Sequence, residues 1–370
     1  MTDSQKLIET FDARVERREN RRAFFTNALS VAAVGGAFVY ANAAAAQAAA
    51  PAQIDIDVLN FALNLEYLEA TFYSYASFGT PLAATMTTGT GTNGFAASAT
   101  TSAGAHAVNF TDPVVSQYAK EIAQDEIAHV NFLRSTLGSL AVAQPQLDVG
   151  TSPTGAFSTA ARAAGIIGPT TAAAPTFFDP YASDENFLLG AFIFEDVGVT
   201  AYKGASPLLV NKTYLEAAAG ILAVEAYHAS IVRTVLYGKG MSVGGTPIPA
   251  AFGGGTYPAT TPNPALITNA GLISAARDSL DGTSATPAAN RITVDPVTGK
   301  DTSDDQGIAP VTTGAGVRAN VAPLNLNGLA YSRTANAVLN IVYLNANAVS
   351  MGGFFPAGVN GNIKTSTQQV

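Results

Sequence analysis

The chain has 370 residues, of which 48% are hydrophobic and only 12% charged, so it can bury a substantial core and is not a wholly disordered polymer. Its formal net charge of -8 argues against nucleic acid as a partner, because surfaces that bind phosphate are rich in Lys and Arg. The sequence contains no cysteine, which excludes disulfides and thiolate ligands and leaves oxygen and nitrogen atoms to hold any metal.

Residues 1–46 are predicted to form an export signal. A polar stretch with five arginines precedes a short apolar run from Ala28 to Tyr40. Asn20-Arg21-Arg22-Ala23-Phe24-Phe25 resembles a twin-arginine signal, and the alanines of residues 41–46 offer small-residue cleavage sites. The alternative is an uncleaved membrane anchor, but the run is shorter than the ~20 residues of a spanning helix. We therefore expect the twin-arginine export machinery as a partner and a periplasmic or secreted location.

A first long helix is predicted from Ile54 to Phe78, where apolar residues recur at helical spacing. Asp55 and Asp57 lie near its start, where acidic side chains suit the positive end of the helix dipole. Residues 79–112 are rich in Gly, Thr, Ala and Ser without sustained periodicity. We expect them to form a long inserted loop.

A second helix is predicted to begin at the capping signal Thr111-Asp112-Pro113 and to run to about Leu137, before Gly138. Residues 139–182 contain five prolines and are expected to be irregular.

A third helix is predicted from Ser183 or Asp184 to about Gly204. A fourth should cover about Asn211 to Tyr237, because Gly238 and Gly240 are typical of a helix end.

The remainder of the chain is predicted to add one helix to this bundle. Residues 241–325 are rich in Gly, Pro and Thr and are expected to form surface loops. A fifth helix should run from Ala330 to about Ala348. The expected fold is all-α, with a four-helix bundle in residues 51–240 and a C-terminal helix and tail, residues 326–370, packing on it.

Two Glu-x-x-His motifs carry the strongest chemical signal. They are Glu126-Ile127-Ala128-His129 in the second helix and Glu225-Ala226-Tyr227-His228 in the fourth, and residues three apart share a helix face. The first and third helices each place one Glu in an apolar run, where a lone carboxylate needs a partner. One Glu from each of two helices and Glu-x-x-His from each of two others can hold two metal ions. The predicted ligands are Glu66, Glu126, His129, Glu195, Glu225 and His228.

An internal repeat supports this assignment. Tyr73 follows Glu66 by seven residues and Tyr202 follows Glu195 by seven, which returns to nearly the same helix face. Antiparallel pairing of the two copies would give a site with pseudo-twofold symmetry. The tyrosines are expected to hydrogen-bond ligand carboxylates, to take part in electron transfer, or to pack in the core.

Asp125 is predicted to support a ligating imidazole, which usually donates its second N–H to a carboxylate or carbonyl. By pseudo-symmetry its partner would be His228, and a solvent-facing Asp is the alternative. The matching position before Glu225 is Val224, so His129 needs another partner.

Four further titratable residues are weaker candidates. Glu69 could share the face of Glu66 and is expected to support the ligands or to lie at the surface. Glu121 and Glu216 point away from the ligands of their own helices and are expected to be solvated. His106 is expected to be a surface histidine, because no acidic residue is near it in sequence.

Three segments resemble the ferritin-like superfamily, and within it the desiccation-related proteins and their bacterial relatives. They are Leu59-Asn60-Phe61-Ala62-Leu63-Asn64-Leu65-Glu66-Tyr67-Leu68-Glu69-Ala70, Ala223-Val224-Glu225-Ala226-Tyr227-His228-Ala229, and Gly352-Gly353-Phe354-Phe355-Pro356 with Asn360-Gly361. The resemblance extends over about residues 54–238 and 328–363. It implies a ferritin-like bundle with a di-iron or di-manganese centre, and all six ligand positions are present.

The expected function is redox chemistry at two iron or two manganese ions. A small-molecule oxidant or reductant, namely peroxide, dioxygen or Fe(II), is the expected partner. The competing hypothesis is a structural or desiccation-protective protein whose metals only stabilise the bundle. The sequence does not choose between iron and manganese, and it leaves the formation of a homo-oligomer open.

Overall fold

The computed structural model describes residues 51–241, 263–281, 305–313, 316–325 and 327–368. The predicted export signal, residues 1–46, lies outside them.

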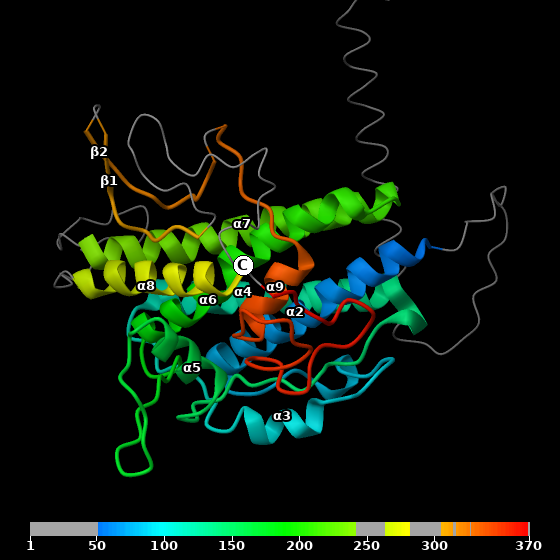
Figure 1. Cartoon of the computed structure of the whole chain (residues 1–370), viewed down its shortest axis with the longest axis horizontal. Helices are drawn as coiled ribbons and strands as arrows, with labels where there is room; N and C mark the ends of the chain where they lie inside the picture. Colours follow the sequence, from blue (N-terminus) through cyan, green and yellow to red (C-terminus); the bar gives the residue numbers. More distant parts are fainter. Residues whose placement is uncertain (1–50, 242–262, 282–304, 314–315, 326, 369–370) are drawn as a thin grey trace, which may run out of the picture. The chain divides into compact units, whose positions relative to one another are not determined.

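Four long helices form the bundle, and they match the prediction closely at most of their ends. They are α2 (Gln53–Phe78), α4 (Pro113–Leu137), α6 (Asp184–Ala205) and α7 (Lys212–Met241). Helix α2 packs mainly against α4 and α6 mainly against α7, while α2 also contacts α6 and α4 contacts α7 (Figure 1). The all-α fold class and the bundle of four long helices are thus confirmed.

Local chemistry explains where these helices begin and end. The Asp112 carboxylate accepts hydrogen bonds from the backbone N–H groups of Val114 and Val115, as an N-cap should. Ser183 Oγ does the same for Asn186 at the start of α6. Helix α2 ends at Gly79, whose φ of 73° lies in the left-handed region that glycine enters freely.

Helices α2 and α6 form the centre of the bundle. Every residue from Val58 to Ser74 in α2 and from Phe187 to Gly198 in α6 is buried. Helices that are apolar on all sides are typical of such central positions. Helices α4 and α7 bury one face each, and any polar group on these buried faces must therefore find its partner inside the bundle.

Helix α7 is longer than predicted, because it continues through Gly238 and Gly240 to Met241. A Cβ on Gly240 would lie 2.6 Å from a carbon of Ile267, so this glycine permits a close approach to α8 (Pro264–Asp281) instead of ending the helix. By length and composition α7 could also cross a membrane, but core helices pass the same test, and α7 buries Glu225, His228 and Arg233.

The segments expected to be irregular contain shorter elements. They are η2 (Ala84–Met86), α3 (Phe95–Thr101), η3 (Gly138–Leu140), α5 (Ala156–Ala163), η4 (Ser206–Leu208), α8 (Pro264–Asp281) and an antiparallel hairpin of β1 (Val311–Thr313) and β2 (Gly316–Arg318). The last helix, α9 (Ala335–Val342), is shorter than the predicted Ala330–Ala348, because the chain turns at Leu344 with a φ of 53°. The expectation that 241–325 holds only loops was wrong for residues 264–281, where α8 buries Leu266, Ala270 and Ile273 at helical spacing.

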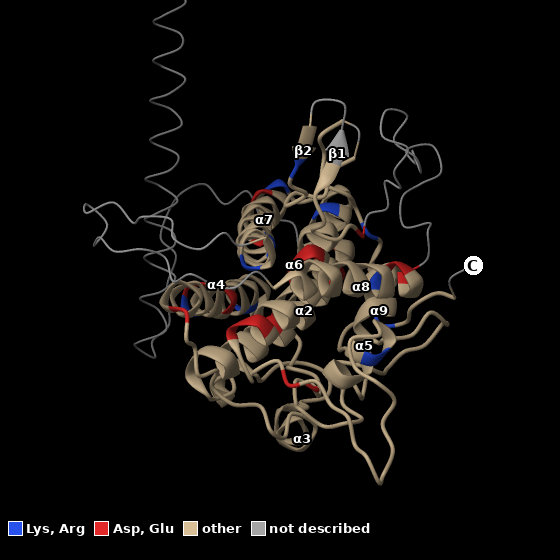
Figure 2. Ribbon diagram, turned by 90° about the vertical axis from the view of Figure 1, so that its left-hand side faces the viewer, with Lys and Arg blue, Asp and Glu red and all other residues tan. Residues whose placement is uncertain are grey.

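Helices α8 and α9 pack on α6 on the side away from α4, and α5 packs on α8 (Figure 2). The C-terminal tail also packs on the bundle. Asn64 in α2 donates a side-chain hydrogen bond to the Asn360 carbonyl and accepts one from the Asn360 N–H. The Phe354 ring lies 4.9 Å from that of Phe194 in α6.

A buried ionic network fastens α8 and the segment after residue 305 to the bundle. Its members are Arg233, Arg277, Arg333, Asp196, Asp281 and Asp305. Asp196 Oδ2 accepts hydrogen bonds from Arg233 at 2.7 Å and Arg277 at 2.8 Å. Asp305 accepts from Arg277 at 2.7 Å and also from Arg333. Three arginines thus face three aspartates, and the network needs no further cation.

Asp305→Ala should lower the free energy of unfolding by about 3–5 kcal/mol, because it leaves Arg277 and Arg333 short of a buried counter-charge. Urea unfolding measures this. Glu121→Ala, at an exposed position of α4, is the control and should change stability by less than ~0.5 kcal/mol. Equal, small effects of both substitutions would show that the network does not hold the fold together.

Candidate metal centre

The six predicted ligands lie together in the core between the four long helices. Each is less than 9% exposed. Ligand atoms of Glu66, Glu126, His129 and Glu225 all lie within 4.8 Å of one another, and so do those of Glu126, Glu195 and His228. Glu126 belongs to both groups. Their convergence is a finding of the structure, whereas their role as metal ligands stays a prediction.

The first group is arranged around the imidazole of His129. Its Nδ1 lies 3.2 Å from Glu66 Oε2, 3.5 Å from Glu126 Oε2 and 3.9 Å from Glu225 Oε1. Three carboxylates from three helices thus surround one nitrogen. Such a set of nitrogen and oxygen donors suits iron or manganese.

The second group repeats this pattern around His228. Its Nδ1 lies 3.0 Å from Glu126 Oε1 and 3.7 Å from Glu195 Oε2. Each oxygen of Glu126 therefore faces a different histidine, which places this carboxylate between two adjacent positions for a cation. The ring centroids of the two histidines are 6.4 Å apart.

The two tyrosines of the internal repeat cross between the helices. Tyr73 on α2 donates a hydrogen bond to Glu195 Oε1 on α6, and Tyr202 on α6 donates one to Glu66 Oε1 on α2. Burial and the neighbouring carboxylates raise the pKa of both phenols well above the usual value, so both stay protonated as donors. Of the roles left open by the sequence, the structure shows the hydrogen bond to a ligand carboxylate.

Asp125 contacts His228, the partner expected from the pseudo-symmetry, and its support of a metal-bound imidazole stays a prediction. Its Oδ2 lies 3.2 Å from His228 Nε2, which leaves Nδ1 directed at Glu126 and Glu195. The Asp125 side chain is 43% exposed, so it links the buried centre to the surface. The equivalent residue near His129 is Val224, and the two halves of the site differ in this respect.

Glu69 lies close to the centre. The sequence had left open whether it supports the ligands or lies at the surface. It is 7% exposed, and one of its oxygens lies within 4.8 Å of ligand atoms of Glu195 and Glu225. The alternative of a surface position was therefore wrong. Its spacing of three from Glu66 was the available signal.

Gly198 is a residue that sequence reasoning missed. It follows Glu195 by three residues, as Glu69 follows Glu66, so the repeat has glycine on one side and a carboxylate on the other. A Cβ at Gly198 would lie 2.1 Å from Glu225 Oε2. The glycine thus leaves room for the Glu225 carboxylate.

The remaining candidates lie outside the cluster. Glu121, Glu216 and His106 are exposed, as expected. The His106 ring lies 5.4 Å from that of Tyr181, and its Nδ1 is 2.7 Å from the Gly104 carbonyl.

Several atoms of the cluster lack a hydrogen-bond partner among the described residues. They are both oxygens of Glu126, Oε2 of Glu69, Glu195 and Glu225, and Nδ1 of His228. The short Glu126–His228 distance does not have hydrogen-bonding geometry. Buried polar atoms are rarely left in this state, and a buried ionised carboxylate needs a counter-charge. Unpartnered carboxylate and imidazole atoms that converge in pairs are what two bound cations would use, so the residues fit a two-metal centre.

The pKa values reflect the same imbalance of charge. Burial raises the pKa of Glu66 to about 7 and that of Glu195 to about 8. Burial alone would lower the pKa of the imidazoles, but the carboxylates around them raise it to about 11 for His129 and about 10 for His228. Burial also raises the pKa of Glu225 well above its usual value, with Glu126 adding to the shift. The metal-free site therefore retains protons that cations would displace.

Comparison with known proteins gives a consistent result. The chain matches the family model of the ferritin-like domain over residues 54–238. It is 32% identical over 183 residues to the desiccation-related protein PCC13-62 of Craterostigma plantagineum, a match that covers 50% of this chain and 53% of that protein. It is 26% identical over 313 residues to the ferritin-like catalase Nec2 of Nesocodon mauritianus, covering 84% of this chain and 85% of that protein.

Gly198→Ala should weaken metal binding by roughly 10- to 100-fold, as changes around metal ligands commonly do, because the new methyl group displaces the Glu225 carboxylate. Metal titration followed by elemental analysis measures this. Gly220→Ala is the matched control, since a Cβ there meets no atom within 4 Å. Equal metal affinity in both variants would contradict the assignment of Glu225.

The metal-free protein should lose stability as the pH rises from about 5 to 10. Groups whose pKa is raised by folding, such as Glu195 to about 8 and His228 to about 10, bind extra protons in the folded state over this range. Their stabilising effect is present below the unfolded pKa and is lost as the pH passes the folded pKa. Thermal unfolding with a chelator should show a falling Tm, and the added metal should raise Tm more at high pH. A Tm of the chelated protein that rises with pH would contradict this charge assignment.

Proposed function

We propose that this chain, which belongs to the ferritin-like domain family and its desiccation-related branch, is an exported oxidoreductase that consumes hydrogen peroxide at a two-metal centre. The observation that carries the proposal is the buried cluster of carboxylates and imidazoles with unpartnered atoms. Two iron or manganese ions would supply redox cycling and open positions for a molecule with an O–O bond.

Each residue of the cluster has a task in this proposal. Glu66 and His129 would hold one ion, Glu195 and His228 the other, and Glu126 lies where a shared carboxylate is needed. Glu225 joins the first group through its Oε1.

Three further residues fix the directions of these ligands. Tyr73 donates a hydrogen bond to one oxygen of Glu195, and Tyr202 donates one to an oxygen of Glu66. The other oxygen of each carboxylate is left for the centre. Asp125 fixes the ring of His228 through Nε2. A set of ligands held in this way changes little in geometry when substrate arrives.

The similarity of this chain to a known catalase favours peroxide over the other small substrates. The relative that aligns with most of this chain is named as a ferritin-like catalase. Dioxygen and Fe(II) are the alternatives that such a centre accepts.

The second candidate is a protective protein without catalysis. The desiccation-related relative has the higher identity, and ions that join four helices would stabilise the bundle strongly. The two candidates differ in what the loaded protein does to peroxide.

The double substitution Glu126→Gln and Glu225→Gln should abolish metal binding and reduce peroxide consumption by roughly 100-fold or more, because it removes two of the four carboxylates that face the ions. Oxygen release and loss of peroxide absorbance measure it. Glu216→Gln on the exposed face of α7 is the control. If the loaded native protein consumes peroxide no faster than the double variant while the metals raise its Tm, the protective role is correct.

We propose further that the protein acquires its metals before export. A nitrogen and oxygen site generally binds copper or zinc more tightly than iron or manganese, so loading outside the cell would select the wrong ions. A twin-arginine signal, which Asn20 to Phe25 resembles, carries folded proteins.

Replacing Arg21 and Arg22 by Lys should leave metal-loaded precursor inside the cell. Cell fractionation with elemental analysis of the purified protein measures both location and metal content. Replacing the whole segment with a signal for unfolded export is the control and should give protein with zinc or copper. Normal export of the Lys variant with unchanged metal content would contradict the proposal.

A further inference from the structure

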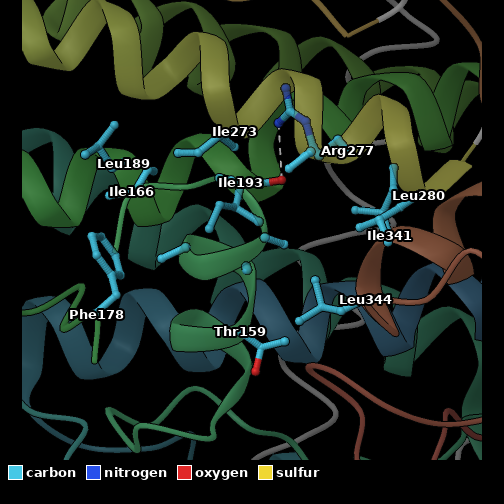
Figure 3. Close-up of a pocket in the computed structure, with 15 residues that line it drawn as sticks. Thr159, Ile166, Phe178, Leu189, Ile193, Ile273, Arg277, Leu280, Ile341 and Leu344 are labelled. Atoms are coloured by element: carbon cyan, nitrogen blue, oxygen red, sulfur yellow. Dashed lines mark hydrogen bonds between the residues drawn. The ribbon is translucent and has the colours of Figure 1, made fainter. Parts of the chain in front are cut away.

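Two small cavities lie side by side next to α6. The outer one has a volume of about 60 Å³ and is lined by residues of α5, α6, α8 and α9, among them Leu189, Ile273 and Ile341 (Figure 3). Its lining is almost wholly apolar. Thr159 and Ala163 at its rim are exposed, so this cavity reaches the surface.

The inner cavity lies between the outer one and the metal centre. It has a volume of about 10 Å³ and is lined by apolar residues of α2, α6 and α9 and by Glu69 and Gly198. Ile193 and Ile341 line both cavities and separate them. The order from the surface inward is therefore the outer cavity, the two isoleucines, the inner cavity and the metal centre.

The inner cavity has one polar end. Glu69 Oε2 is buried and has no hydrogen-bond partner among the described residues. A carboxylate oxygen of Glu69 also lies within 4.8 Å of ligand atoms of Glu195 and Glu225. Gly198, on the same cavity, adjoins Glu225 Oε2. A molecule in the inner cavity would touch Glu69 on one side and face the centre on the other.

The outer wall of this route is fixed by the ionic network. Arg277 donates hydrogen bonds to the carbonyl of Phe192 at 2.6 Å and to that of Ile193 at 3.3 Å, and so holds α8 over α6. Figure 3 shows the bond to Ile193. Its other nitrogens bind Asp196 and Asp305, so the guanidinium offers little charge to the cavity.

We infer that the two cavities form the entry route to the metal centre for a small uncharged molecule with an O–O bond, and that Glu69 is its polar contact at the inner end. The inference rests on the proposed function and adds that its substrate reaches the centre as an uncharged molecule through these cavities.

Size and polarity limit what can use this route. An inner cavity of about 10 Å³ accepts a molecule about the size of water, with some movement of Ile193 and Ile341. A hydrated metal cation would have to shed its water against an apolar wall, which is very unfavourable. Hydrogen peroxide and dioxygen share the required chemistry, and only peroxide can donate a hydrogen bond to Glu69.

The route can be tested without catalysis, because apolar cavities bind xenon. Crystals of the metal-free protein under xenon pressure should show xenon in the outer cavity. Ile341→Phe should lower xenon occupancy of the outer cavity, which Ile341 also lines, whereas Ile341→Ala should join the two cavities and admit xenon to the inner one. Absence of xenon from both cavities of the native protein and of Ile341→Ala would overturn the inference.

Kinetics test the same route in the loaded protein. Ile341→Phe should lower kcat/KM for peroxide, or the second-order rate of reaction of the reduced centre with dioxygen, roughly tenfold, with metal content unchanged. If only one of these two reactions slows, its substrate, peroxide or dioxygen, is the molecule that uses the route. Ile308→Phe makes the same change in size at a buried position that lines neither cavity and is the control.

The two proposals fail in different ways. If the native loaded protein reacts and Ile341→Phe reacts equally fast, the route is wrong and the proposed function stands. If the native loaded protein reacts with neither molecule, the proposed function is wrong, and xenon binding alone decides whether the route exists.

Discussion

The structure depends on how charge is compensated inside the bundle. Helix α6 carries two adjacent acids, Glu195 and Asp196, and they meet opposite environments. Asp196 faces Arg233 and Arg277, so its charge is matched within the protein. Glu195 faces a core that holds four more buried glutamates and only two histidines. On the first side of the helix the charges are matched within the protein, whereas on the second side buried carboxylate oxygens remain without a partner among the described residues.

In the part of the chain that the structure describes, two acidic clusters have ligand atoms close enough together to hold a metal. They differ in how their charges are compensated. Asp281 and Asp305 lie close together with Asp278, but Arg333 and Arg277 bind them. The glutamate cluster has unpartnered oxygens instead. The internal repeat makes the two halves of the glutamate cluster similar, but two pairs of equivalent positions differ. Glu69 in one half corresponds to Gly198 in the other, and Asp125 corresponds to Val224. Glu69 and Gly198, which differ between the halves, both line the inner cavity.

The sequence could predict the four helices and the convergence of the six side chains, because both depend on local spacing. Helical periodicity, the caps at Asp112 and Ser183, and the three-residue spacing of Glu126 and His129 are all readable along the chain. Even the contact of Asp125 with His228 followed from the repeat. The position of Glu69 could not be decided, since it depends on how α2 is turned towards α6 and α7.

Other features depend on contacts between distant residues. Helix α8 lies among Gly- and Pro-rich residues, and its position is set by Arg277 reaching α6. Gly240 resembles a helix end, but it serves the contact with Ile267. Gly198 has meaning only once Glu225 is seen beside it. Glycine and arginine often have such roles, which depend on tertiary packing that single-sequence patterns do not contain.

The most direct test of the account is anomalous diffraction from crystals of protein purified after native production, recorded on both sides of the iron and manganese absorption edges. Two peaks are expected in the bundle core, one beside Glu66 and His129 and the other beside Glu195 and His228, with Glu126 between them. A core without peaks, or a peak at Asp278, Asp281 and Asp305 instead, would contradict the claim that uncompensated carboxylates in this bundle bind two metal ions.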